Sequence, residues 1–178
     1  AKLVGNLFFM NPLGFGYLGK AQFKILSEDL ALGLLRQIVI SIGGLEYAPA
    51  KSKLERVIFS MKEDRKTRMC IGRCLISEVS DSFLVVREIR NLPQPVEVCA
   101  GQILFWDKRF KIKFAGNDGT SILRAAGHEG LIQIQNEFKS QKKVLIIPNE
   151  GLMALPVLHE SDNIYQFPRL DVLNQVYD

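Results

Sequence analysis

Cationic side chains gather in one short part of the chain, and such a cluster is what binding to a polyanion requires. Residues 51–73 hold eight Lys and Arg against three Asp and Glu, an excess of five, while the whole chain carries only +4. A solvated helix face followed by a charged loop would give the same composition. The members of this cluster that we take as candidates for RNA binding are Lys51, Lys53, Arg56, Lys62, Arg65, Lys66 and Arg73.

A second group of cations alternates strictly with apolar residues along 109–114, which is typical of a strand with one face on a core. The cations would stand about 6.8 Å apart, close to the separation of successive phosphates in a nucleic-acid strand. Cations that only keep an exposed sheet face soluble would explain this alternation equally well. Trp106 is interpreted as a core residue rather than a base-stacking one. The cations of this predicted ladder are Arg109, Lys111 and Lys113, opposite the core residues Phe110, Ile112 and Phe114.

Residues that could carry catalysis or hold a metal are few and scattered. His128 and His159 are the two histidines, and neither lies at metal-ligand spacing from a cysteine or a carboxylate. The chain has no G-x-S-x-G nucleophile motif and no phosphate-binding loop of the G-x-x-x-x-G-K-S/T type. We therefore predict no catalytic residue and no metal ligand, although spacing along the chain cannot reveal a site assembled from distant residues.

The three cysteines, an odd number, argue against a disulfide scaffold. Cys70 and Cys74 fall within one predicted strand, 68–77, where their Cα atoms would lie about 13 Å apart, too far for a disulfide. Two ordinary thiols in a reducing, cytoplasmic setting are the expectation.

Two helices are expected to position the first cluster. Ser27 is a suitable N-cap, apolar residues follow at helical spacing, and Gly43-Gly44 ends the helix. Pro49 begins the second helix, with the cations spread around an apolar face. Residues 1–25 are predicted as strand, turn and strand, and residues 68–77 and 82–90 as a hairpin. The apolar face of the second helix consists of Leu54, Val57, Ile58 and Met61.

Two prolines within Asn91-Leu92-Pro93-Gln94-Pro95 predict a stiff connector and a domain boundary. The expected fold class is α+β, in two small units. Residues 1–95 would form a helical, substrate-binding domain with a β-hairpin. Residues 96–178 would form a small, mainly antiparallel β domain with a short helix. The elements predicted in the second domain are a hairpin at 102–114 that turns at Asp107-Lys108, a helix around 132–138, a final hairpin of 144–147 and 152–155, and a tail from 159.

Length and composition fit this organisation. The chain has 178 residues, 47% hydrophobic and 24% charged, enough for one ordinary domain or two small ones. No apolar run approaches the roughly 18–20 residues that a membrane-spanning helix needs. The first residue is Ala1 rather than Met, and we expect the sequence to be a piece of a longer protein or a processed one.

Four groups of motifs follow one another between about residues 30 and 158. They are Gly43-Gly44 with Tyr47-x-Pro49 and Leu54-Glu55-Arg56, then Ile71-Gly72-x-Cys74 with Val86-Arg87-Glu88, then Leu104-Phe105-Trp106-Asp107-x-Arg109-Phe110, and last Gly151-Leu152-Met153-Ala154-Leu155-Pro156-x-Leu158. Their order and spacing resemble the C-terminal region of bacterial tRNA(Ile)-lysidine synthases, in particular of an alphaproteobacterial type. Two departures are Pro49-Ala50-Lys51, where the family tends to have two prolines and an arginine, and Gly72-Arg73-Cys74 in place of Gly-Gly-Cys.

The resemblance implies an ATP-dependent ligase that adenylates the wobble cytidine of an isoleucine tRNA, after which lysine displaces AMP to form lysidine. In this family an N-terminal ATP-pyrophosphatase domain with an S-G-G-x-D-S loop carries that chemistry and takes ATP with Mg and lysine. The present chain has no such loop. It would therefore be the tRNA-binding portion, without catalysis or a cofactor of its own. Its partners would be tRNA and the N-terminal domain, with no membrane, and a homodimer is one open alternative.

Two other functions stay open at this point. The chain could be a structural or protein-interaction module without RNA affinity, in which the cations only keep the surface soluble. It could also be an independent small enzyme that gathers His128 or His159 with carboxylates in one pocket, although no spacing in the sequence points to such a pocket.

Overall fold

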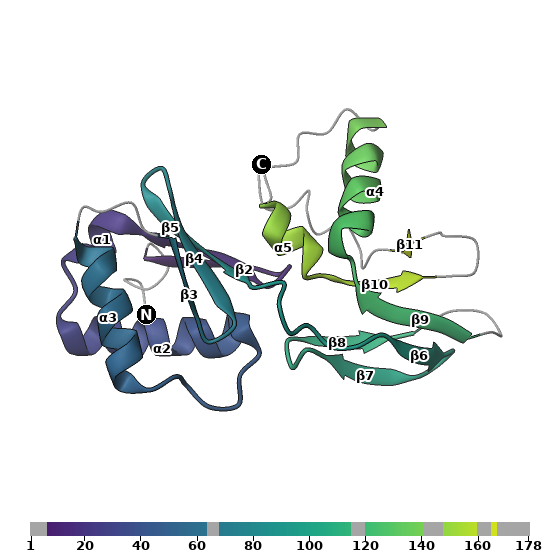
Figure 1. Cartoon of the computed structure of the whole chain (residues 1–178), viewed down its shortest axis with the longest axis horizontal. Coiled ribbons are helices and arrows are strands. Elements are labelled where there is room, and N and C mark those ends of the chain that lie inside the picture. The colour runs from purple at the N-terminus through teal and green to yellow at the C-terminus, as the bar shows by residue number, and fades with distance from the viewer. Residues whose placement is uncertain (1–6, 64–67, 115–119, 141–147, 160–164, 167–178) are drawn as a thin grey trace. The chain divides into compact units, whose positions relative to one another are not determined.

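The computed structural model describes residues 7–63, 68–114, 120–140, 148–159 and 165–166. The chain forms two compact units, divided between Glu88 and Ile89, and each is described here by itself (Figure 1). Both units combine helices with antiparallel strands, so the predicted α+β class is confirmed. The proline-containing connector falls at the start of the second unit.

The first unit contains a five-stranded antiparallel sheet with the strand order β1-β2-β5-β4-β3. The predicted strand, turn and strand near the N-terminus thus join the later strands in one sheet. A short helix, α1 (Lys20–Lys24), follows β2 where no helix was predicted. The strands are β1 (Phe8–Asn11), β2 (Phe15–Gly19), β3 (Arg68–Ile71), β4 (Cys74–Val79) and β5 (Ser82–Arg87).

The prediction of one continuous strand over 68–77 was wrong, because the chain reverses at Gly72 and Arg73. Both residues have positive φ, 54° and 61°, as a two-residue hairpin turn requires. The predicted hairpin is therefore a three-stranded meander, β3-β4-β5. Cys70 lies exposed on β3 and Cys74 lies buried on β4, so the geometry assumed for a single strand does not hold.

Both predicted helices of this unit are confirmed. Helix α2 (Glu28–Gly43) begins with the Ser27 side chain accepting the backbone N–H of Leu30 at 3.5 Å. It ends at Gly44, whose φ of 61° is the left-handed conformation that glycine adopts without a Cβ penalty. Helix α3 (Lys51–Lys62) begins two residues after Pro49 and buries its predicted apolar face.

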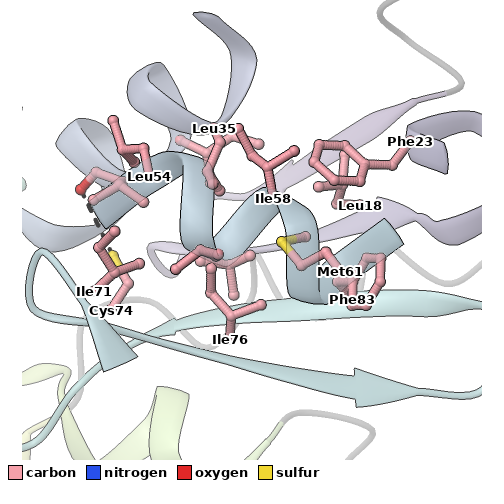
Figure 2. Packing of buried hydrophobic residues seen from close by; sticks show 14 of the residues in the cluster. Leu18, Phe23, Leu35, Leu54, Ile58, Met61, Ile71, Cys74, Ile76 and Phe83 are labelled. Carbon is pink, nitrogen blue, oxygen red and sulfur yellow. Dashed lines mark hydrogen bonds between the residues drawn. The ribbon is translucent and has the colours of Figure 1, made fainter. Parts of the chain in front are cut away.

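The core of the first unit lies between these helices and one face of the sheet (Figure 2). Met61 of α3 lies beside Phe83 of β5 in Figure 2, and Leu54 and Ile58 of α3 belong to the same buried cluster. Full burial of one such side chain stabilises a fold by about 1.5–3 kcal/mol. The core therefore holds α3 against the sheet and determines which of its side chains remain outside.

The second unit combines a four-stranded sheet, in the order β11-β10-β9-β6, with a separate hairpin of β7 and β8 (Figure 1). Its core contains Trp106, which is 2% exposed, together with Val98, Phe114 and Leu123. The interpretation of Trp106 as a core residue is confirmed. The elements are β6 (Val96–Cys99), β7 (Ile103–Trp106), β8 (Phe110–Lys113), β9 (Thr120–Ala125), α4 (Gly127–Ser140), α5 (Asn149–Met153), β10 (Pro156–His159) and β11 (Tyr165–Gln166).

The predicted turn at Asp107-Lys108 is confirmed, and both residues have positive φ, 49° and 56°. The prediction of a strand at 152–155 was wrong, because Leu152 and Met153 belong to helix α5 and the strand begins only at Pro156. A short, fully buried apolar run has no periodicity that separates a helix from a strand. Residues 144–147 lie outside the described residues. Helix α4 begins earlier than expected, at Gly127.

Candidate nucleic-acid interface

A groove of about 690 Å³ opens on the first unit between the loop before α3, the exposed side of α3 and strand β3. Most of its lining is apolar, and two cations, Lys53 and Arg56, stand along one side. We call it the basic groove. It is lined by Leu45, Tyr47, Lys53, Arg56, Met69 and Cys70, among others.

The helical repeat places the two cations of the basic groove next to each other. Leu54, Val57 and Ile58 are buried against the sheet. Lys53 and Arg56 are three residues apart, so they lie on one side of the helix, one turn after the other. Both residues are exposed. Two cations at this spacing, beside an apolar surface, can hold phosphates while leaving a place for a base or ribose.

Tyr47 adds an aromatic side chain to the basic groove and is 80% exposed. Sequence reasoning did not select it as a functional residue, since it entered only as part of the motif Tyr47-x-Pro49. Its place in a short loop between two amphipathic helices was the available signal. Loops of this kind carry binding residues on a rigid framework. An exposed ring beside cations can stack on a nucleobase.

A very close backbone approach positions β3 at the end of the basic groove. Helix α2 reaches the β3-β4 turn at Gly43, where a Cβ atom would lie 2.1 Å from the carbonyl oxygen of Gly72. A Cβ on Gly72 would in turn meet Val39 and Pro49, within 2.9 Å of each. The buried Cys74 thiol lies beside this contact, 3.6 Å from the Val39 carbonyl oxygen (Figure 2). Glycine at both positions therefore lets α2, the loop before α3 and β3 meet.

Of the other cations of the predicted cluster, the three that the structure describes do not line this groove. Lys62 donates a hydrogen bond from Nζ to the Leu26 carbonyl oxygen at 2.6 Å and so ties α3 to the segment after α1. Lys51 lies 3.6 Å from Glu55 in an exposed ion pair. Arg73 is exposed in the β3-β4 turn. Arg65 and Lys66 lie outside the described residues.

Lys51 and Lys62 instead line a second groove, of about 420 Å³, between α2 and α3. Four carboxylates line it with them, which leaves this groove net negative by two charges. A polyanion is repelled by such a surface. The geometry therefore favours Lys53 and Arg56 over Lys51 and Lys62 as phosphate ligands. The four acidic residues are Glu28, Asp29, Glu55 and Glu63.

Of the three cations predicted to share one exposed face of the second hairpin, Arg109 does not lie on that face. The Arg109 side chain is 3% exposed and forms an ion pair with Asp107 at 2.7 Å, whose side chain is 2% exposed. Arg109 also donates to the Ala154 carbonyl oxygen at 2.9 Å, which ties the hairpin to the segment after α5. Placing Arg109 on the exposed face was therefore wrong. Lys111 and Lys113 are exposed on β8, as predicted.

In the part of the chain that the structure describes, no three His, Cys, Asp or Glu side chains come together in a way that could hold a metal ion. Among the same residues, no helix is long and apolar enough to cross a membrane. Neither observation assigns a function. The basic groove, with two cations beside an apolar lining, is therefore the candidate site.

The two units define an α+β protein whose first unit carries a cationic, largely apolar groove. Its sequence is similar to tRNA(Ile)-lysidine synthases. Identity is 25% over 161 residues with the Wolbachia pipientis wMel protein, covering 89% of this chain and 36% of that protein. It is 24% over 115 residues with the protein of Wolbachia sp. subsp. Brugia malayi (strain TRS), covering 64% and 27%. It is 31% over 86 residues with the Rhizobium meliloti (strain 1021) protein, covering 48% and 19%.

These matches confirm the resemblance to tRNA(Ile)-lysidine synthases, and they lie in the C-terminal region of the relatives. The chain spans about a third or less of the length of these relatives. No family model matches the chain. No solved structure matches it either.

Proposed function

We propose that this chain is the tRNA-binding C-terminal portion of a tRNA(Ile)-lysidine synthase. The observation that carries the proposal is the basic groove, where Lys53, Arg56 and the exposed Tyr47 surround an apolar lining. Phosphate contacts position a nucleic acid without reading its sequence. A groove of this kind would fix how a tRNA lies relative to an active site elsewhere in the enzyme.

The rest of the reaction is what the resemblance to tRNA(Ile)-lysidine synthases implies, and it belongs to the same proposal. ATP with Mg and lysine would bind to an N-terminal catalytic domain, and lysine would be joined to the wobble cytidine of an isoleucine tRNA there. The present chain would contribute affinity and orientation, with no catalytic step of its own. The modification of the tRNA would take place in the cytoplasm.

A protein-interaction module is the second candidate, and one observation favours it. Ile25 and Leu30 are large apolar side chains that are well exposed on the first unit, five residues apart in the sequence. Exposed apolar side chains of this size are candidates for a contact with another protein. In that case the chain would show no RNA affinity even at low ionic strength.

Reversal of both groove cations, Lys53→Glu with Arg56→Glu, is expected to weaken tRNA binding by the whole chain at least about tenfold. The slope of log affinity against log salt should become shallower by about two, since each lost phosphate contact removes about one released counterion. Filter binding of a labelled tRNA at several salt concentrations measures both quantities.

A matched pair of single variants serves as the control, in which Arg36→Glu is compared with Arg56→Glu. Both arginines are exposed on helices of the first unit and each change alters the charge by two, but Arg36 does not line the basic groove. Only Arg56→Glu should reduce tRNA binding strongly. Equal effects would mean that net charge alone drives binding, and wild-type affinity in the double variant would remove the basic groove from the proposal.

The exposed Cys70 thiol provides an independent test, since it lines the basic groove. Bound tRNA is expected to slow the alkylation of Cys70, with Cys99 replaced by Ser to simplify the readout. The buried Cys74 should react slowly with or without RNA. Protection should disappear in the Lys53→Glu, Arg56→Glu variant, and undiminished Cys70 reactivity under saturating tRNA would contradict the predicted contact.

A further inference from the structure

The hairpin of β7 and β8 has two faces of different character. Its inner face belongs to the core of the second unit, through Leu104, Trp106, Phe110 and Ile112. The strand register places Phe105 directly opposite Lys111 and Ile103 directly opposite Lys113. Directly opposed residues of an antiparallel pair point to the same side of the sheet. We call this outer set of Ile103, Phe105, Lys111 and Lys113 the hairpin face.

The apolar members of the hairpin face are large and well exposed, Phe105 by 72% and Ile103 by 52%. Their cross-strand neighbours Lys111 and Lys113 are exposed as well. Each exposed apolar side chain is thus paired with a lysine. Lysines that served only solubility would not account for a phenylalanine and an isoleucine on the same side.

The charge of the hairpin face is uniformly positive. Asp107 is the one carboxylate between Ile103 and Lys113, and it lies buried in its ion pair with Arg109. The same arginine holds the hairpin to Ala154, so this surface is presented by a fixed element of the second unit. An anionic ligand would meet lysines here without a competing carboxylate from the hairpin.

The pairing of an aromatic ring with cations favours unpaired nucleotides over a duplex. In a double helix the faces of the bases are stacked on each other, and only phosphates and groove edges remain for a protein. In a single strand each base has a free face that can stack on an aromatic side chain, while the backbone follows the cations. Lys111 and Lys113, two residues apart on one strand, are separated by about 6.8 Å, a spacing that suits successive phosphates.

We propose that the hairpin face binds an unpaired segment of RNA, with a base stacked on Phe105 and the neighbouring phosphates held by Lys111 and Lys113. If the RNA is a tRNA, as the proposed function requires, the ligand is one of its single-stranded segments. Binding to an isolated single strand can nevertheless be measured without any assumption about tRNA.

Phe105→Ala in the whole chain is the central variant, and the probe is a labelled, unstructured RNA oligonucleotide of about eight nucleotides. We expect its affinity, measured by fluorescence anisotropy, to fall about tenfold. Binding to an RNA duplex of the same length should stay unchanged. Phe105→Trp should retain the affinity and Phe105→Leu should lose most of it, since stacking needs a ring rather than apolar area alone.

Phe59→Ala is the matched control, because Phe59 is similarly exposed, at 66%, but lies on α3 of the first unit. It should leave oligonucleotide binding at the wild-type level. Lys111→Glu with Lys113→Glu should weaken binding and make the salt dependence shallower by about 1.4, or 0.7 for each single-strand phosphate contact. Trp106 fluorescence during denaturation confirms that each hairpin variant without an added tryptophan is folded.

Wild-type affinity of Phe105→Ala for the oligonucleotide would overturn the proposal, and so would an equal loss for the duplex. Loss of single-strand affinity in Phe105→Ala and retention in Phe105→Trp would support it. Tight tRNA binding that depends on Lys53 and Arg56 but not on Phe105 would support tRNA binding by the basic groove. It would contradict RNA binding by the hairpin face. If the wild-type chain binds no RNA, both proposals fail and a protein contact becomes the better explanation of this surface.

Discussion

Asp107→Asn is expected to destabilise the second unit by about 3–5 kcal/mol, the usual cost of removing one partner of a buried ion pair. The Arg109 guanidinium would remain 3% exposed and charged, without the carboxylate that lies 2.7 Å away in the wild type. Asparagine is the suitable replacement because residue 107 has a φ of 49°, which Asn tolerates and Ala does not. The expected loss therefore reports the missing charge rather than backbone strain.

Fluorescence of Trp106 during chemical denaturation measures this loss directly. Trp106 is the one tryptophan of the chain, and it is buried in the core of the second unit beside the altered residue. Addition of Arg109→Met should recover much of the stability, since an apolar side chain can replace a buried charge without its desolvation cost. The control is Glu129→Gln, which removes the partially exposed ion pair with Arg124 and should cost at most about 1 kcal/mol. A similar small cost for Asp107→Asn would show that the buried pair is not needed for stability.

Gly43→Ala is expected to destabilise the first unit by about 3 kcal/mol, even though alanine is the better helix former. In the interior of a helix, replacing glycine by alanine ordinarily gains about 1 kcal/mol. At residue 43, however, the new Cβ would lie 2.1 Å from the Gly72 carbonyl oxygen and 3.3 Å from the Cys74 sulfur. A backbone atom cannot move aside as the end of a side chain can, so the steric cost outweighs the gain in helix propensity.

The matched control lies in the same helix. Apart from its chain neighbours and the backbone of its own helix, a Cβ at Gly33 would meet no atom within 4 Å, and Gly33→Ala should therefore stabilise the first unit by up to about 1 kcal/mol. The rate of alkylation of Cys74, in a chain with Cys70 and Cys99 changed to Ser, reports the opening of this unit, because Cys74 is fully buried in its core. Faster alkylation in Gly43→Ala and slower alkylation in Gly33→Ala are the expected results. Stabilisation by both changes would contradict the close contact between Gly43 and Gly72.

Local signals in the sequence were sufficient for helices α2 and α3 of the first unit, although they did not predict α1. The Ser27 cap, the left-handed Gly44 and the apolar spacing of α3 each depend on residues within a few positions of one another. The turn at Gly72 and Arg73 was missed although Gly72 was visible in the sequence. A run of β-forming residues on both sides of the turn predicts a longer strand equally well, and only pairing with β5 shows where the chain must reverse.

The candidate sites likewise divide into features that the sequence predicted and features that it missed. Alternation along residues 109–114 predicted one face for the three cations, and two of them conform to it. Arg109 follows directly after two residues with positive φ, and the turn brings its guanidinium to the buried Asp107 carboxylate. Phe105 was not selected as a binding residue, although its neighbour Trp106 was predicted to lie in the core and neighbouring residues on a strand point to opposite faces.

By itself, the sequence determined the α+β class, the two clusters of cations, the resemblance to tRNA(Ile)-lysidine synthases and the apolar faces of the main helices. All of these depend on residue types and on periodicities within single elements. Only the tertiary structure decided that Lys53 and Arg56 line a groove with Tyr47, that Lys51 and Lys62 stand among carboxylates, and that Phe105 lies across from Lys111. The physical reason is that the period of a helix or strand defines its own faces, whereas a binding surface depends on which elements, distant in the chain, pack beside each face.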